Sequence, residues 1–288
     1  MVKRIVSIIV LVLGCASIAM PQRVSLADEA RQERERRKEI EVAREQLVKE
    51  VLQYSGGIVI LDQLSRTFAD SSDRFFVQVP EEARERLKES TLESVSSSRL
   101  RPTFKKTFAM EMDGVTLVEV SRWFKTPAGS RIFQAESHQT VPDPDFLKRP
   151  VPPDRARLVE EIDRQMQSSE RTVASIAIMS KAMLSEMLEV SGESQAKKAA
   201  FLRDFERGFF ASAKAPITAA IRNGILFTYR DVSDTDLEEY VHFLRTPAGQ
   251  TFSHATWKAL QASLAQGGAD AGMAFGQVLK EMARSKTP

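Results

Sequence analysis

The chain has 288 residues, of which 42% are hydrophobic and 28% charged. This balance is ordinary for a soluble globular protein, and the length allows one large or two ordinary domains. Only 7% of the residues are aromatic, so we expect a core built mainly from aliphatic side chains, with phenylalanine as the commonest large one.

The first 27 residues have the pattern of a secretory signal peptide. Lys3 and Arg4 precede an apolar run over residues 5–20, and Ser25 and Ala27 supply small residues before the cleavage position. The run is short for a membrane-spanning helix, which needs roughly 20 residues; an uncleaved anchor is an alternative. Cleavage after Ala27 leaves 38 basic and 39 acidic residues, so we expect no nucleic-acid partner.

The single cysteine, Cys15, lies inside this leader. Residues 12–15 (VLGC) resemble a lipobox, in which the cysteine becomes the acylated first residue of a lipoprotein. The apolar run continues past Cys15 to Met20, so we favour ordinary cleavage and keep lipidation as an alternative. Ordinary cleavage leaves no cysteine, which excludes disulfides and thiol catalysis. We expect membrane association only if Cys15 is lipidated or the leader is uncleaved.

The rest of the chain shows helical periodicity and no sustained two-residue alternation, which predicts an all-α multi-helix bundle. Residues 28–38 are almost wholly charged and predict a solvated helix extension, which becomes amphipathic before a stop at residues 55–57. The apolar spacing over residues 58–68 is again compatible with a helix, and a short strand over 58–60 is the alternative. Pro80 predicts a helix start, and Asp113 an N-cap. We expect later helices over 154–190, 193–213, 216–229, 234–245 and 247–265, and one after Gly267-Gly268.

Residues 141–153 (VPDPDFLKRPVPP) contain five prolines and predict a linker, because each proline lacks a donor and restricts its predecessor. We therefore divide the chain into a signal peptide over 1–27, a first helical repeat over 28–140, the Pro-rich linker over 141–153 and a second helical repeat over 154–288.

The tetrapeptide TPAG occurs at residues 126–129 and again at 246–249. Threonine can serve as an N-cap with proline at the first helical position, so each copy predicts a tight joint between two helices. The small residues after proline should allow a helix or ring to approach closely. Residues 117–129 and 237–249 agree at six of 13 positions, and residues 46–51 resemble 157–162. Two joints in register indicate an internal duplication.

The repeated corner motif supplies our candidate residues for a structural or interaction role. They are Leu117, Glu119, Trp123, Phe124, Thr126, Pro127 and Gly129 in the first copy, and Leu237, Glu239, Phe243, Leu244, Thr246, Pro247 and Gly249 in the second. We expect Trp123 and Phe243 to occupy corresponding apolar pockets.

Residues 227–252 (FTYRDVSDTDLEEYVHFLRTPAGQTF) resemble the signature of an exported bacterial family of unknown function, DUF2059. That signature has an acidic helix start, a leucine, an aromatic pair and then Ser/Thr-Pro-x-Gly. Residues 105–133 resemble a second, weaker copy that lacks the acidic start. The resemblance implies a helical protein of the cell envelope and supplies no catalytic residues.

The sequence contains no convincing catalytic or metal-ligating constellation. His138, His242 and His254 show no metal-ligand spacing, so we expect no metal and no cofactor. Ser194 and Lys197 match the Ser-x-x-Lys pattern of some acyl enzymes, but the companion motifs are missing.

Two further patterns leave alternatives open. Glu119 and Glu239 occupy equivalent positions, so they form either a paired-carboxylate site or two solvated helix faces. A stripe of apolar residues at three- and four-residue spacing predicts either core packing or one wall of a ligand pocket. Its members are Ile176, Met179, Met183 and Met187.

We therefore expect an exported, periplasmic and non-enzymatic helical protein that acts as a binding or structural module for another envelope protein. The main alternative is a carrier of an apolar small molecule or lipid between its helices, and the third is an unrecognised hydrolase.

Overall fold

The structure is a computed structural model that describes residues 26–59, 61–62, 65–66, 81–138 and 145–285. Every regular element in these residues is a helix, which confirms the predicted all-α multi-helix class. Cys15 and the predicted signal peptide up to residue 25 lie outside the described residues, as do residues 141–144 of the predicted linker. The chain forms two compact units, residues 1–44 and 45–288.

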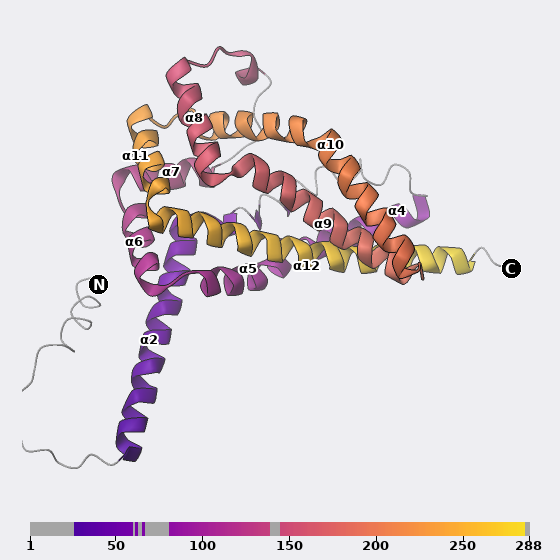
Figure 1. Cartoon of the computed structure of the whole chain (residues 1–288), viewed down its shortest axis with the longest axis horizontal. Coiled ribbons are helices and arrows are strands. Elements are labelled where there is room, and N and C mark those ends of the chain that lie inside the picture. Colours follow the sequence, from indigo (N-terminus) through magenta and orange to yellow (C-terminus); the bar gives the residue numbers. More distant parts are fainter. Residues whose placement is uncertain (1–25, 60, 63–64, 67–80, 139–144, 286–288) are drawn as a thin grey trace, which may run out of the picture. The chain divides into compact units, whose positions relative to one another are not determined.

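Figure 1 shows the helices in chain order. They are α2 (Leu26–Tyr54), α4 (Glu81–Ser94), α5 (Ser97–Glu111), α6 (Gly114–Phe124), α7 (Pro127–Ser137), the 3-10 turn η1 (Phe146–Lys148), α8 (Pro153–Met166), α9 (Ser168–Val190), α10 (Gln195–Thr228), α11 (Asp234–Arg245) and α12 (Pro247–Ser285). Residues 57–59 are helical, so the alternative of a strand over 58–60 is wrong for these residues.

The described part of the first unit is the amino-terminal part of α2. Its side chains are exposed from residue 31 to residue 43, and Arg37 forms an ion pair with Glu33 one turn earlier (2.8 Å). The predicted solvated helix extension is thus confirmed where its side chains are described.

Polar side chains cap several helices as elementary helix chemistry predicts. The Asp113 carboxylate accepts a hydrogen bond from the Thr116 N–H (2.9 Å), which confirms the predicted cap of α6. Ser233 Oγ accepts from the Asp236 N–H (3.2 Å) at the start of α11. These bonds satisfy amide groups that have no partner within the first helical turn.

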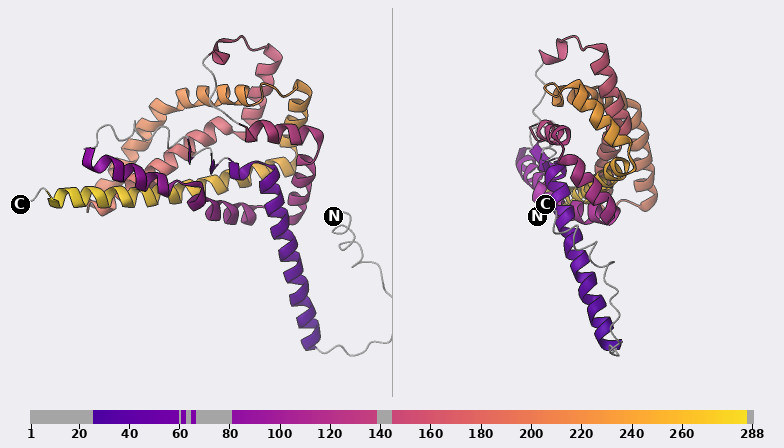
Figure 2. Two further views of the ribbon diagram at one scale, coloured as in Figure 1. Left: turned by 180° about the vertical axis from the view of Figure 1, so that it is seen from behind. Right: turned by 90° about the vertical axis from the view of Figure 1, so that its left-hand side faces the viewer.

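The second unit has one large core. Helix α12 packs against α9, α5 and α4 and also contacts α6, α8 and α11; the left view of Figure 2 shows α9 running alongside it. Fully buried residues of this core include Val51, Phe104, Phe108, Leu117 and Ile162. The core therefore joins helices from both halves of the sequence.

Glycines make the contact between α9 and α12 unusually close. A Cβ atom added to Gly268 would lie 2.4 Å from the Met179 carbonyl oxygen, and one added to Gly272 would lie 2.1 Å from that of Met183. Gly276, four residues later, would place a Cβ 2.6 Å from Val190 Cβ. Only glycine fits at these positions, because the nearest atoms belong mostly to helix backbone.

Several predicted helix ends are wrong. Helix α12 continues through Gly267-Gly268 because these glycines allow tight packing rather than ending the helix. Helix α10 continues through Pro216, whose side chain is exposed. The predicted helix over 154–190 is interrupted at Gln167, which adopts a left-handed conformation (φ 53°). There the Asp163 carboxylate accepts from both the Ser169 N–H and the Ser169 hydroxyl, each at 2.8 Å.

We predict that Gly272→Ala destabilises the protein by about 1–3 kcal/mol, because the added methyl forces α9 and α12 apart. Gly208→Ala is the matched control, since Gly208 lies within α10 and its Cβ would meet nothing within 4 Å. This control should stabilise the protein by up to about 1 kcal/mol through helix propensity. Urea unfolding followed by circular dichroism measures both. Equal effects of the two substitutions would contradict the close α9–α12 contact.

Candidate functional site

The two TPAG corners have the same hydrogen-bond geometry. Thr126 Oγ1 accepts from the Gly129 N–H (3.0 Å) and donates to the Trp123 carbonyl (2.7 Å). Thr246 makes the same two bonds, to the Gly249 N–H (3.0 Å) and the Phe243 carbonyl (2.7 Å). Each threonine therefore satisfies a group at the end of one helix and a group at the start of the next.

The glycine of each corner has a different role from the one expected. A Cβ on Gly129 would lie 2.3 Å from the Trp123 carbonyl oxygen, and a Cβ on Gly249 would lie 2.1 Å from that of Phe243. The space that glycine leaves is therefore occupied by the end of the incoming helix, not by a separate helix or an aromatic ring. Glycine therefore allows the outgoing helix to begin directly against the end of the incoming helix.

The aromatic residues of the two corners stack on each other. The Trp123 and Phe243 rings are nearly parallel (13°), with centroids 4.2 Å apart, and Tyr240 stacks against Trp123 at 5.3 Å. Phe243 is buried and Trp123 is partly buried. The structure thus brings the two residues, which were expected in corresponding apolar pockets, into contact with each other in one shared cluster.

The other motif residues are divided between core and surface. Leu117, Leu237, Phe124 and Leu244 are buried, and the prolines Pro127 and Pro247 occupy first helical positions on the surface. Glu119 and Glu239 are both exposed, which favours solvated helix faces over a paired-carboxylate site.

Each corner also carries an ion pair that the sequence reasoning missed. Lys125, just before Thr126, pairs with Glu50 of α2, and Arg245, just before Thr246, pairs with Glu161 of α8 (2.8 Å). The segments over 46–51 and 157–162 place these two glutamates at equivalent positions. Partial burial opposes ionisation of Glu161, but hydrogen bonds, that of Arg245 first, lower its pKa to about 2.

The remaining catalytic candidates have plain structural roles or none. Ser194 caps α10 by accepting from the Lys197 N–H (3.4 Å), which accounts for the Ser-x-x-Lys spacing. His138, His242 and His254 are exposed. Across the described residues, no three histidine, cysteine or acidic side chains form a group that could hold a metal ion.

The methionine stripe lines an apolar cavity of about 510 Å³ between α4, α9 and α12. Met179, Met183 and Met187 form one wall, and Phe275 lies on the α12 side. Among the described residues, the polar side chains in the lining are the hydroxyls of Thr91 and Ser180. The described residues that line the cavity are Thr91, Val95, Ile176, Met179, Ser180, Met183, Leu184, Met187, Gly268, Ala271, Phe275 and Leu279. The α9 and α12 backbones meet at Gly268 and Gly272, and the side chains of the α9 methionines line the cavity next to this contact.

A second, smaller cavity of about 150 Å³ lies beside the carboxyl group of Glu136. Two buried tyrosines, Tyr229 and Tyr240, donate hydrogen bonds to Glu136 Oε1 at 2.5 and 3.2 Å. Burial raises the pKa of Glu136 to about 7, even though the tyrosine hydroxyls favour the ionised form. A carboxyl group that changes charge near neutral pH indicates a site that can accept a proton or a cation.

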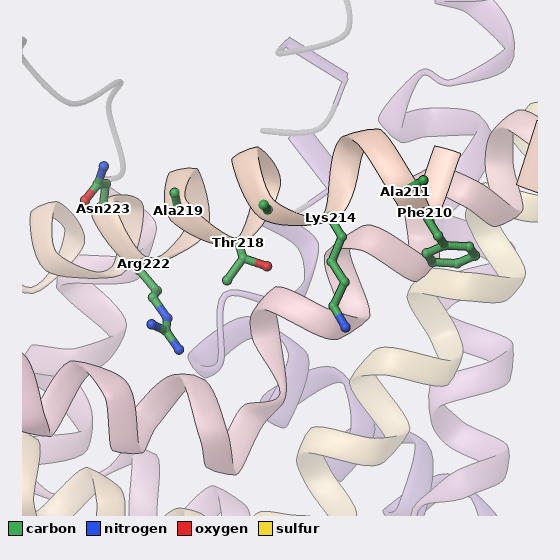
Figure 3. A pocket seen from close by; sticks show the side chains of 8 residues that line it. Phe210, Ala211, Lys214, Thr218, Ala219, Arg222 and Asn223 are labelled. Carbon is green, nitrogen blue, oxygen red and sulfur yellow. The ribbon is translucent and has the colours of Figure 1, made fainter. Parts of the chain in front are cut away.

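The groove along α10 is more open. It measures about 700 Å³, and all the described residues that line it belong to this helix, with Phe210, Lys214, Thr218 and Arg222 on one side of it (Figure 3). Arg222 already interacts with Asp163 at 3.4 Å. A groove with a single helix as its wall does not enclose a ligand, so the two cavities are the better candidates.

The described residues define an all-α, multi-helix protein that contains a large apolar cavity between α4, α9 and α12. No protein-family model, curated protein or solved structure matches the chain. Its resemblance to DUF2059 therefore stays a prediction. None of the described helices is sufficiently long and apolar to cross a membrane.

We predict that Phe243→Ala destabilises the protein by about 3–5 kcal/mol, the usual range for a large buried aromatic residue, and that Trp123→Ala costs less, because Trp123 is only partly buried. Because the two rings stack, the double variant should lose clearly less than the sum of the single losses. Urea unfolding of the four proteins gives this coupling free energy. Additive losses, or no loss from either substitution, would show that the stack does not join the corners.

We predict that Glu136 makes the protein less stable as the pH rises from about 4.5 to about 7. Its pKa is raised in the folded protein, so across this range the unfolded chain loses the proton first and unfolding becomes easier. The loss should reach at most about 3 kcal/mol. Glu136→Gln keeps an acceptor for the tyrosines and should remove this dependence. The measurement compares the unfolding free energies of the two proteins between pH 5 and 7.5; parallel curves would contradict it.

Proposed function

We propose that this protein is an exported, non-enzymatic binding protein that holds a neutral apolar molecule in the cavity between α4, α9 and α12. The observation that carries this proposal is the cavity itself, about 510 Å³ in volume and lined by the methionine stripe. The proposal takes up the alternative of an apolar carrier, because it has a specific site. Binding of an envelope protein remains a prediction, and we assign no specific site to it.

The cavity volume favours a ligand the size of one lipid chain. A cavity of roughly 150 Å³ is known to hold one benzene molecule, so about 510 Å³ accommodates roughly 20 carbon atoms by the same scale. This volume also lies within the usual range for small-molecule sites, roughly 300–1,000 Å³. Methionine side chains are flexible and polarisable, and they can adjust to a chain of varied shape.

The lining also limits the chemistry of the ligand. The described part of the lining contains no charged side chain, and its side-chain polar groups are the hydroxyls of Thr91 and Ser180. An isolated charge would be costly to bury there. We therefore infer that the buried part of the ligand is neutral and apolar, with any charged head group outside the cavity.

The proposal includes export and an internal duplication. Export rests on the leader pattern of residues 1–27. The duplication is supported by the matching hydrogen bonds of Thr126 and Thr246 and by the equivalent ion pairs of Glu50 and Glu161. Two related helical units joined through one core would provide the scaffold that carries the cavity.

We predict that the full chain binds N-phenyl-1-naphthylamine, an apolar fluorophore that becomes bright in apolar surroundings. Ser180→Phe places a ring inside the cavity and should weaken binding at least about tenfold, an effect of about 1.4 kcal/mol. Ser185→Phe is the matched control, because Ser185 is on the same helix but outside the lining. Met187→Trp is a second filling variant, and circular dichroism checks that all three fold. Unchanged binding in both filling variants would overturn the proposal.

Native mass spectrometry of the protein purified from its own host identifies what it carries. A retained apolar mass of lipid size supports the proposal of an apolar ligand. A co-purified protein in its place overturns that proposal and supports the prediction of an envelope partner. The intact mass also gives the first residue of the mature chain. We expect Asp28, and an acylated Cys15 would show that the leader is processed as a lipoprotein.

A further inference from the structure

Two hydroxyl groups lie in the wall of the apolar cavity between α4, α9 and α12. Thr91 lines the cavity from α4 and is only 2% exposed, and Ser180 lines it from α9. The other described side chains of the lining are aliphatic, aromatic or thioether groups. The two hydroxyls are therefore the polar groups that a ligand in this cavity would meet first.

Neither hydroxyl has a hydrogen-bond partner among the described residues. Four other hydroxyls in the described part of the chain also have no partner, but surrounding atoms enclose those oxygens. The Thr91 oxygen is not enclosed in this way, which agrees with its place in the cavity wall. Both hydroxyls are therefore open to a molecule that occupies the cavity.

A hydroxyl in a helix can usually avoid this state by donating to the carbonyl of the residue four positions earlier. Ser94 does so in α4, where its Oγ donates to the Ser90 carbonyl at 2.8 Å. Thr91 and Ser180 make no such bond within the described residues, and none to the sulfurs of the neighbouring methionines. Both hydroxyls thus keep a donor that no described group uses.

An oxygen acceptor is the group that these donors lack. A polar group buried without a partner is unfavourable. A bound water needs about two to four polar partners, whereas the side chains of the described lining offer two hydroxyls in a volume of about 510 Å³. A carbonyl oxygen has two lone pairs and brings no donor of its own, so it matches these groups.

We propose that the ligand of this cavity is a neutral, lipid-sized molecule whose buried part carries an uncharged oxygen acceptor, as in a ketone or an ester, and that Thr91 and Ser180 donate hydrogen bonds to it. This inference rests on the proposed function, because it concerns the same cavity. A pure hydrocarbon would leave both hydroxyls unpaired, and an ionised carboxylate would be costly to bury there. The two donors therefore define the polar group of the ligand and its position between α4 and α9.

The test compares two neutral fluorophores of about the same size on the full chain. Prodan, a naphthalene ketone, has a carbonyl group, and a hydrogen bond to this carbonyl shifts its emission to longer wavelength. N-phenyl-1-naphthylamine has no carbonyl group. Thr91→Val and Ser180→Ala should each lower the affinity for prodan, relative to that for N-phenyl-1-naphthylamine, about fivefold, the worth of one neutral hydrogen bond. Each should also shift the emission of bound prodan to shorter wavelength.

Ser94→Ala is the matched control. Ser94 also lies in α4, but its hydroxyl is already bonded to the Ser90 carbonyl, and it does not line the cavity. This variant should leave both the affinity ratio and the prodan emission unchanged. The unfolding midpoint of every variant is measured alongside, so that affinities are compared only among folded proteins.

The possible failures of this inference and of the proposed function can be told apart. If the affinity ratio stays unchanged in both Thr91→Val and Ser180→Ala, or falls equally in Ser94→Ala, the inference is wrong, while binding of N-phenyl-1-naphthylamine by the parent still supports the proposed function. If the parent binds neither fluorophore, both are wrong. A pure hydrocarbon retained by the protein from its own host would overturn the inference and leave the proposed function standing.

Discussion

The indole of Trp123 lies flat against the ring of Phe243, 4.2 Å away, and the two helix corners are held together through this contact. The corner in the first half of the sequence ends α6, and the corner in the second half ends α11. The ion pair between Arg131 and the buried Asp236 joins the same regions with two hydrogen bonds, at 2.6 and 2.7 Å. From the stack, ring contacts pass through Tyr240 to Tyr229, which donates to Glu136. The position of the small cavity therefore depends on how the corners meet.

Features set by local chemistry were predictable from the sequence. The cap at Asp113 and both proline-led corners follow from the conformational limits of proline and the hydrogen-bonding capacity of short polar side chains. The bounds of α11, Asp234–Arg245, agree with the prediction for the same reason. The helix start predicted at Pro80 lies outside the described residues. Helix class was predictable as well, because a 3.6-residue apolar period is a property of neighbouring residues.

Features set by tertiary contacts were not predictable in this way. Pro216 and the Gly267-Gly268 pair look like helix ends, yet α10 and α12 pass through them. In α12 the two glycines lie directly against neighbouring backbone and side chains, so packing outweighs the local preference there. The methionine spacing was compatible with core packing and with one wall of a ligand pocket, and the spacing alone could not decide between them. The cavity is formed only when α4 and α12 pack beside α9. The group around Glu136 has no sequence signature, since its members come from five segments with no fixed spacing. Such a site becomes visible only when the chain has folded.

Because of the glycines along α12, the residues that set the spacing between two helices differ from the residues that line the cavity beside them. At Gly268 and Gly272 the distance between α9 and α12 is fixed by backbone meeting backbone, so side chains do not determine it. The side chains of the methionines that line the cavity therefore do not set the distance between α9 and α12. Exchange of Met183 or Met187 for another apolar residue should reshape the cavity while the helix pair keeps its spacing. The scaffold thus has room to change ligand preference in evolution without refolding.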